Sequence, residues 1–119
     1  MFKLIIAGSR SFEDEGRMLA DLQKLLVNRM PDVEIVHGGC PRGADALASR
    51  CALRLGLPVR VFAADWHKWG KAAGPIRNDE MARYGDALLC YWDGKSAGTK
   101  NMIRCARLRE LRVVVRRFS

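Results

Sequence analysis

The chain has 119 residues, of which 49% are hydrophobic and 29% charged, a length and composition that suit one compact domain with a single core. Its 21 lysines and arginines against 13 acids give a formal net charge of +8, and no apolar run has the length of a membrane span or a signal peptide. Four cysteines lie far apart with no CxxC pair, which argues against a zinc site or a disulfide framework and favours a reducing, cytoplasmic location.

Strand-like and helix-like patterns alternate along the first half of the chain. Residues 3–7 form an apolar run that predicts a strand, and leucines at helical spacing predict a helix over 14–29. A second short strand is expected at 33–37. Small and apolar residues then recur at i, i+3, i+4 and i+7 over 44–55, which is typical of an amphipathic helix. Residues 59–64 complete this half as a third strand.

The second half continues the same alternation after a long segment of mixed character. Residues 64–81 are expected to form a loop, whose end overlaps a short helix at 77–84. The apolar run at 87–92 predicts a fourth strand. A helix over 99–109 and a fifth strand over 112–116 follow.

This order of elements predicts an α/β fold in a single domain over residues 1–119, with a mostly parallel five-stranded sheet covered by helices on both faces. Three loops then follow strand ends at one edge of the sheet, at residues 8–12, 38–45 and 93–99. Ligands of open α/β sheets bind at that carboxyl edge. We therefore expect the functional residues in these loops.

The loop at 38–45, with the sequence GGCPRGAD, is rich in glycine. Gly38, Gly39 and Gly43 permit positive φ and the close approach of a ligand to the backbone. The N–H groups of Gly43 and Ala44 open the following helix and attract phosphate, and Arg42 can supply a fork-shaped counterion. The alternative is a plain strand-to-helix turn. We favour ligand binding, because a turn needs only one glycine.

The other two loops carry small and polar residues that can complete such a pocket. Hydroxyl, carboxylate and guanidinium groups would make hydrogen bonds to a ligand, and the glycines would leave room for it. The candidates in these loops are Gly8, Ser9, Arg10, Asp93, Gly94, Ser96, Gly98 and Thr99.

The segment 64–81 is unusually rich in residues that suit a nucleotide. Trp66 and the second tryptophan, Trp69, can stack on a flat base, while Lys71, Arg77 and Asn78 can bind phosphate or ribose oxygens. The structural alternative is a lid packed by its own tryptophans. At least one of the two is expected to belong to the core.

Positive charge is concentrated near the C-terminus, where residues 98–119 hold seven basic residues against Glu110 alone. Lys100, Arg104 and Arg107 recur at i, i+4 and i+7 and form a basic stripe on one helix face. The stripe can meet nucleic acid or another polyanion. A solvated helix face is the favoured interpretation, because no aromatic residues are interleaved with the charges.

Four motifs in order, GSRSF, HGGCPRGADALA, ADWHKWGKAAGPIRNDEM and WDGKSAGTKNMI, cover nearly the whole chain. Together they resemble the YspA, YpsA-related branch of the SLOG superfamily. The resemblance implies a Rossmann-like domain with a ligand pocket and assigns no reaction to it. The wider superfamily includes sensors of nucleotide derivatives, the Lonely Guy phosphoribohydrolases and the DNA-processing protein DprA.

The resemblance departs from the enzymes of the superfamily at the catalytic position. Lonely Guy proteins carry a PGGxGTxxE signature with a catalytic glutamate, and aligning its GT with Gly98 and Thr99 puts Met102 at that glutamate. Methionine is no general acid or base. Asp45 or Asp93 is the alternative carrier of that chemistry, and neither histidine is assigned a catalytic role. The catalytic residues are therefore left unassigned.

The function predicted from the sequence is the binding of a nucleotide or nucleotide-derived ligand at the carboxyl edge of the sheet, as a sensor or ligand-binding module. The alternatives are a nucleotide N-glycosidase or phosphoribohydrolase and a DprA-like nucleic-acid binder, which the missing glutamate and the lack of interleaved aromatics disfavour. No metal, cofactor or membrane partner is expected. A homodimer is compatible with a small sheet covered by helices.

Overall fold

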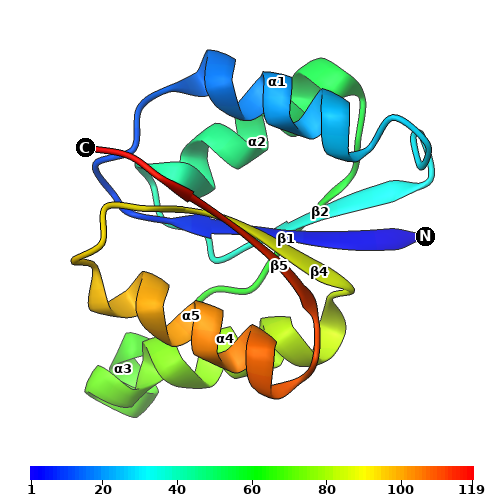
Figure 1. Ribbon diagram of the computed structural model, residues 1–119. Helices are drawn as coiled ribbons and strands as arrows, with labels where there is room; N and C mark the ends of the chain where they lie inside the picture. Colours follow the sequence, from blue (N-terminus) through cyan, green and yellow to red (C-terminus); the bar gives the residue numbers. More distant parts are fainter.

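The computed structural model describes the whole chain, Met1–Ser119. Five parallel strands form one sheet in the order β3-β2-β1-β4-β5: β1 (Phe2–Gly8), β2 (Val33–His37), β3 (Val59–Val61), β4 (Ala87–Trp92) and β5 (Arg112–Arg117). The helices between them are α1 (Glu15–Leu25), α2 (Ala44–Leu55), α3 (Trp66–Trp69), α4 (Ala73–Tyr84) and α5 (Ala97–Leu108), with a 3₁₀ turn over Gly70–Ala72. Figure 1 shows α1 and α2 on one face of the sheet and α4 and α5 on the other. The predicted α/β fold is confirmed.

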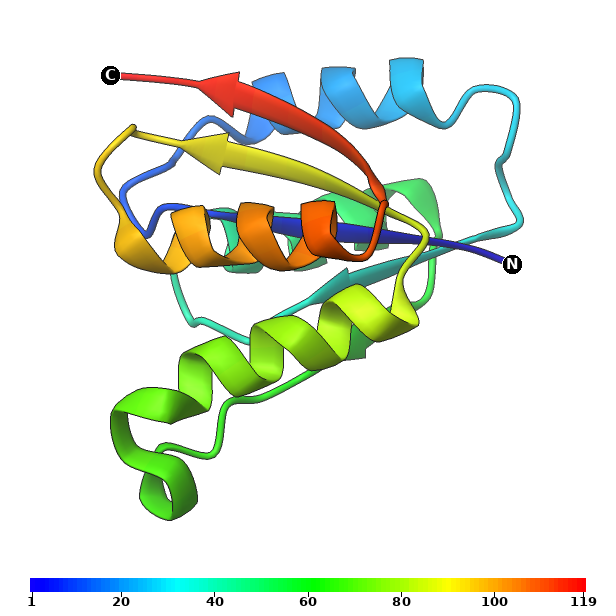
Figure 2. The same ribbon diagram turned by 60° about the horizontal axis from the view of Figure 1, so that its bottom comes forward.

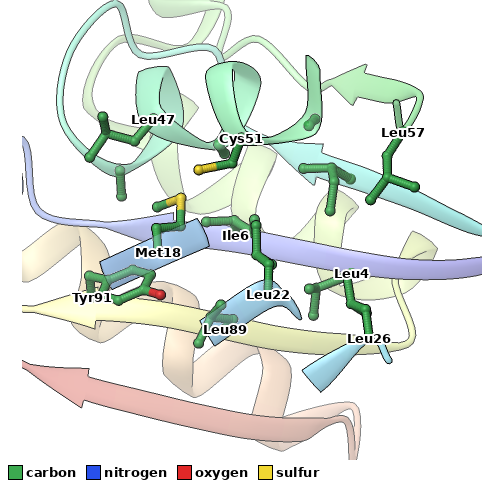
Figure 3. Close-up of a cluster of buried hydrophobic side chains, with 14 of the residues drawn as sticks. Leu4, Ile6, Met18, Leu22, Leu26, Leu47, Cys51, Leu57, Leu89 and Tyr91 are labelled. Carbon is green, nitrogen blue, oxygen red and sulfur yellow. The ribbon is translucent and has the colours of Figure 1, made fainter. Parts of the chain in front are cut away.

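The central strands are apolar along their length because helices cover both of their faces. Successive side chains of β1 point to opposite faces, so Leu4 and Ile6 join the cluster under α1 and α2 while Ile5 joins the cluster under α4 and α5. Figure 3 shows the first cluster, in which Met18 and Leu22 of α1 lie over the strands. Each fully buried leucine or isoleucine of this kind contributes about 1.5–3 kcal/mol to folding.

The neighbouring strands β1 and β4 send the chain to opposite faces of the sheet. β1 is followed by α1, which packs in the first cluster, and β4 is followed by α5, which packs in the second. The loops after these two strands therefore diverge at the carboxyl edge. Such a divergence opens a crevice where α/β sheets bind ligands.

Helix α1 is shorter than the predicted range of 14–29. Asp14 caps its start by accepting a hydrogen bond from the backbone N–H of Arg17 at 3.0 Å. The helix ends at Leu25, and the N–H groups of Arg29 and Met30 both turn back to the carbonyl oxygen of Leu26 at 2.9 Å. The leucine pattern therefore continued past the helix into a tight turn before the second strand.

The segment 64–81 is mostly helical, so the prediction of a long loop was wrong. Asp65 caps α3 by accepting from the N–H of Lys68, and α4 begins at Ala73 with Pro75 in its first turn. Proline is tolerated there because the first N–H groups of a helix have no helical partner. Figure 2 shows α3 projecting from the body of the molecule. Both tryptophans are exposed, Trp66 by 54% and Trp69 by 48%, which contradicts the expectation that one belongs to the core.

The two edges of the sheet are its most exposed strands. β3 covers only Val59–Val61 instead of 59–64, and β5 on the opposite edge carries arginines at both ends. A short or charged edge strand discourages pairing with another chain. None of the helices combines the length and the apolar character that crossing a bilayer requires.

Candidate ligand-binding site

A cavity of about 640 Å³ lies at the carboxyl edge of the sheet, where the loops after β1, β2 and β4 meet. Its floor is the end of β1 with Gly8, and its walls come from the starts of α2, α4 and α5. Trp66 and Lys71, from the segment around α3, also line it. The crevice expected from the strand order is therefore hollow and lined by side chains from five parts of the chain.

Most of the residues predicted from the sequence line this one cavity, although they come from loops far apart in the chain. Those that line it are Gly8, Ser9, Arg10, Gly38, Asp45, Trp66, Lys71, Arg77, Asn78, Asp93, Ser96, Gly98 and Thr99. The structure does not bring Gly39, Arg42, Gly43, Ala44 or Gly94 to its lining. Arg42 and Gly43 instead line a neighbouring cavity.

The glycine turn packs closely against its neighbours in the fold. Gly43 has φ +75°, and a Cβ there would lie 2.5 Å from Cα of Arg10 and 2.6 Å from the carbonyl oxygen of Ser9. Gly39 has φ +78° and lies against the side chain of Val61. The space beside these two glycines is thus filled by the protein itself. The missing side chains allow the turn after β2 to pack against these neighbours.

Ser9 joins the loops after β1 and β4. It is 2% exposed, its N–H donates to the carbonyl oxygen of Tyr91 at 2.9 Å, and its hydroxyl accepts from the N–H of Asp93 at 3.2 Å. Its carbonyl oxygen accepts from the N–H of Ala44 at 3.4 Å, at the start of α2. Ser9 therefore connects three walls of the cavity: the loop after β1, the loop after β4 and the start of α2.

Asp93 supports the turn before α5. One of its carboxylate oxygens accepts from the N–H groups of Lys95 and Ser96, both at 2.8 Å. These two hydrogen bonds are the main reason that the pKa of Asp93 lies below its usual value, because they stabilise the charged form. Asp93 stays ionised at neutral pH, which makes it unsuited to the acid work that the sequence left open for it.

Asp45 lies in a more buried environment, next to His37 and Arg77. Its carboxylate accepts from the N–H of Cys40 at 3.1 Å. Burial raises the pKa of Asp45 above its usual value, while the Cys40 N–H, His37 and Arg77 offset part of that effect. Asp45 is therefore the carboxyl group of the cavity whose pKa is displaced toward neutral pH.

His37 is 4% exposed and has a structural set of partners. Its Nδ1 accepts from the N–H of Gly39 at 3.0 Å, so Nε2 carries the proton and donates to the hydroxyl of Ser49 at 2.6 Å. Burial is the main cause that lowers the pKa of His37, which keeps the ring neutral. His37 thus braces the glycine turn against α2.

Arg77 and Asn78 connect the cavity walls. The Nη1 group of Arg77 donates to the carbonyl oxygens of Gly38 at 2.6 Å and Phe62 at 3.3 Å, and its Nε donates to Oδ1 of Asn78 at 3.0 Å. Asn78 is 5% exposed and donates to Oδ1 of Asn101 at 2.9 Å. These bonds tie α4 to the turn after β2 and to α5, so both side chains position the walls.

Sequence reasoning missed several lining residues, most of which carry no chemical signal of their own. They are Ala7, Ser11, Cys40, Gly74, Pro75, Met81, Ala97, Asn101 and Met102. Met102, aligned with the catalytic glutamate of the Lonely Guy enzymes, is 1% exposed and does line the cavity. Asn101 follows Gly98 by three positions in α5, so the two residues lie on one face of the helix. This spacing could have indicated Asn101.

No three His, Cys, Asp or Glu side chains come together in an arrangement that holds a metal ion. The polar groups of the cavity are instead cations, amides, hydroxyls and two carboxylates. Such a lining suits an organic ligand that carries negative charge.

Comparison with known proteins agrees with this architecture. A model of the YspA, cpYpsA-related SLOG family matches residues 2–69. The Gene 61 protein of Mycobacterium phage D29 is 36% identical over 110 residues, which is 87% of this chain and 87% of that protein. A solved structure of DNA processing protein A from Helicobacter pylori, which describes its single-stranded DNA binding mode, has a TM-score of 0.72 and 18% identity.

The alignment with DNA processing protein A covers 96% of this chain and 64% of the other, so the chain spans less than two thirds of that protein's length. At 18% identity this likeness establishes the Rossmann-like fold alone. The family match covers more than half of the chain, and the phage relative extends over most of it. The chain therefore belongs to the YspA, cpYpsA-related SLOG family.

Proposed function

We propose that this protein binds a nucleotide or nucleotide-derived ligand in the carboxyl-edge cavity, as a sensor or ligand-binding module. The single observation that carries the proposal is one cavity that combines an exposed indole with free cations. Its volume of about 640 Å³ lies in the range of small-molecule pockets. The family assignment and the DNA-binding relative of the same fold support a ligand of nucleotide chemistry.

Trp66 is the platform proposed for the base. It is 54% exposed, and its ring packs over the first turn of α4, where a Cβ on Gly74 would lie 3.2 Å from it. A side chain larger than hydrogen at Gly74 would lift the indole. The small residue therefore lets the ring lie close to α4, and its exposed surface can stack on a base in the cavity.

Lys71 and Arg10 are the cations proposed for the phosphate. Both side chains line the cavity, both residues are exposed, and neither takes part in an ion pair. Arg77, by contrast, already donates to two backbone carbonyls. Arg77 supplies positive charge from the wall, while Lys71 and Arg10 are free to contact an anion.

Substituting Trp66→Ala is expected to weaken nucleoside monophosphate binding about tenfold, because one stacked base is lost. Trp69→Ala is the matched control, since Trp69 is similarly exposed in α3 and does not line the cavity. Titration calorimetry with the four common ribonucleoside monophosphates measures both effects. Equal losses in the two variants, or no binding by the parent, would contradict the proposal.

Asp45 favours a second candidate, hydrolysis of an N-glycosidic bond. A carboxyl group with a raised pKa retains its proton nearer to neutral pH, as a general acid must. Water would attack C1′ of the ribose, and the departing base would take up the proton. Binding without hydrolysis is the favoured function, because Met102 supplies no ionisable group to activate the water.

Incubation with nucleoside monophosphates is therefore expected to release little free base, as followed by liquid chromatography. The low rate has a physical reason, since Met102 supplies no base and the carboxylate of Asp93 is already engaged by the N–H groups of Lys95 and Ser96. Rapid release that disappears in Asp45→Asn, while nucleotide binding persists, would establish the enzyme instead.

Nucleic-acid binding is a third candidate that one observation favours. The basic stripe lines a groove of about 580 Å³ between α5 and β5, together with Arg117 and Trp92. The guanidinium of Arg117 lies 5.2 Å from the centre of the Trp92 ring. The sequence suggested that no aromatic residue accompanies the stripe. The fold brings Trp92 to it from the end of β4.

Binding of single-stranded DNA to this groove is expected to be weak and to fall roughly 20-fold between about 50 and 200 mM salt, as for three neutralised phosphates. Replacing Lys100, Arg104 and Arg107 with glutamine should abolish it and leave nucleotide binding unchanged, because the groove is separate from the carboxyl-edge cavity. Fluorescence anisotropy with a labelled oligonucleotide measures the affinity. Tight binding that resists salt would make nucleic acid the primary ligand.

A further inference from the structure

A second cavity of about 680 Å³ adjoins the first on the side of α1 and α2. Arg10 and Ser11, just after β1, line both cavities. The remaining wall of the second cavity comes from the loop before α1, from the loop before α2 and from the first two turns of α2. The two spaces are therefore neighbours on either side of the loop that follows β1.

Three guanidinium groups dominate the second cavity. Arg10 and Arg42 are exposed and take part in no ion pair, and Arg50 is paired with Glu15 outside the lining through Nε at 2.7 Å. Glu13 is the only acid in the lining. Arginine forks match the geometry of phosphate oxygens, so this surplus of unpaired arginine suits a phosphoryl group.

The loop after β1 forms a ridge between the two cavities, because Arg10 and Ser11 line both. It consists of the backbone of Ser9 and Arg10 pressed against Gly43, whose missing side chain allows the contact. Arg10 lines both spaces. A ligand that crosses the ridge would keep one cation at its middle and meet Arg42 on the far side.

We infer that the second cavity is a subsite for a second phosphoryl group of the same ligand. This inference rests on the proposed function of the first cavity. The base and first phosphate occupy the carboxyl-edge cavity, and the next phosphate passes Arg10 and is held by Arg42. The required chemistry is a nucleotide extended by phosphate, which a nucleoside diphosphate and a phosphodiester-linked dinucleotide both provide.

The test compares AMP, ADP and the 5′-phosphorylated dinucleotide pApA, together with their guanine equivalents, by titration calorimetry at constant ionic strength. ADP or pApA is expected to bind about tenfold more tightly than AMP, because one further arginine–phosphate contact forms. A gain for ADP alone identifies a polyphosphate ligand. A gain for pApA alone identifies a phosphodiester.

Arg42→Gln is expected to remove most of that tenfold gain and to leave AMP binding unchanged, because Arg42 does not line the first cavity. Arg54→Gln is the matched control, since Arg54 is an exposed arginine of α2 that lies outside both cavities. Equal affinities for all three probes, or a gain that survives Arg42→Gln, would overturn the subsite. In either case, binding of AMP would still support the first cavity as a nucleotide site. Failure of every probe to bind would overturn the proposed function as well.

Discussion

Replacing Gly43 with alanine is expected to lower the free energy of unfolding by about 2–4 kcal/mol. Its φ of +75° and ψ of −150° lie in a region that only glycine occupies readily. The added Cβ would also lie 2.5 Å from Cα of Arg10, which is backbone and cannot swing away. Urea unfolding followed by circular dichroism measures the change.

Two other glycines separate backbone strain from steric clash. Gly56 has φ +69° and ψ +30° with nothing within 4 Å of a built Cβ, so Gly56→Ala should cost only about 1–2 kcal/mol. Gly16 lies within α1, where the nearest atom to a Cβ is 3.8 Å away, and Gly16→Ala should stabilise by about 0.5–1 kcal/mol. A loss for Gly43→Ala no greater than that for Gly56→Ala would show that the ridge beside Arg10 yields.

Replacing Arg77 with methionine is expected to cost about 2–4 kcal/mol, because two backbone carbonyls lose a charged donor at once. The carbonyl oxygens are those of Gly38 and Phe62, which anchor the ends of β2 and β3 to α4. Arg77→Lys keeps the charge but has no Nε to hold Asn78 while its terminal nitrogen reaches the two carbonyl oxygens, so we expect an intermediate loss. Unfolding of all three proteins in urea gives the comparison.

The pH dependence of Arg77→Met provides an independent check. The charge of Arg77 lowers the pKa of both Asp45 and His37, so its removal should raise both values. The pKa of Asp45 in the folded state lies above its unfolded value. Its contribution to stability is therefore fully present below the unfolded pKa and lost as pH rises through the folded pKa. In Arg77→Met this loss should extend to higher pH, and NMR titration of His37 should show an upward shift. An unchanged His37 titration would mean that the charge of Arg77 does not act on the pKa of His37.

The order of strands and helices followed from local patterns that are visible in the sequence. An apolar run such as 87–92 has one stable environment, a strand covered on both faces, and the residues of α2 repeat with the helical period. Parallel strands joined by helices then bring their following loops to one edge. This geometry is why residues as distant as Ser9, Asp45 and Thr99 were predicted together, and the structure brings all three to one cavity.

Local patterns failed where long-range contacts decide the conformation. The segment 64–81 shows little helical periodicity, and α4 is held by contacts that its own sequence does not reveal, such as the bond of Asn78 to Asn101 of α5. The sequence also did not show what lies beside Gly43, which is the backbone of Arg10, thirty-three positions earlier in the chain. A glycine in the sequence indicates that a position is crowded, but it does not identify the neighbouring group.

The sequence by itself determined the α/β class, the edge of the sheet that carries the polar loops and most of the residue types gathered there, because each depends on short-range periodicity and on the direction of parallel strands. Only the tertiary structure decided which arginines line the first cavity and which line the second. It also engaged Arg77 with backbone carbonyls, assigned Arg42 to a second cavity and placed Trp92 beside the basic stripe. These outcomes depend on how separate elements pack against one another, and packing is a property of pairs of surfaces that no single stretch of sequence contains.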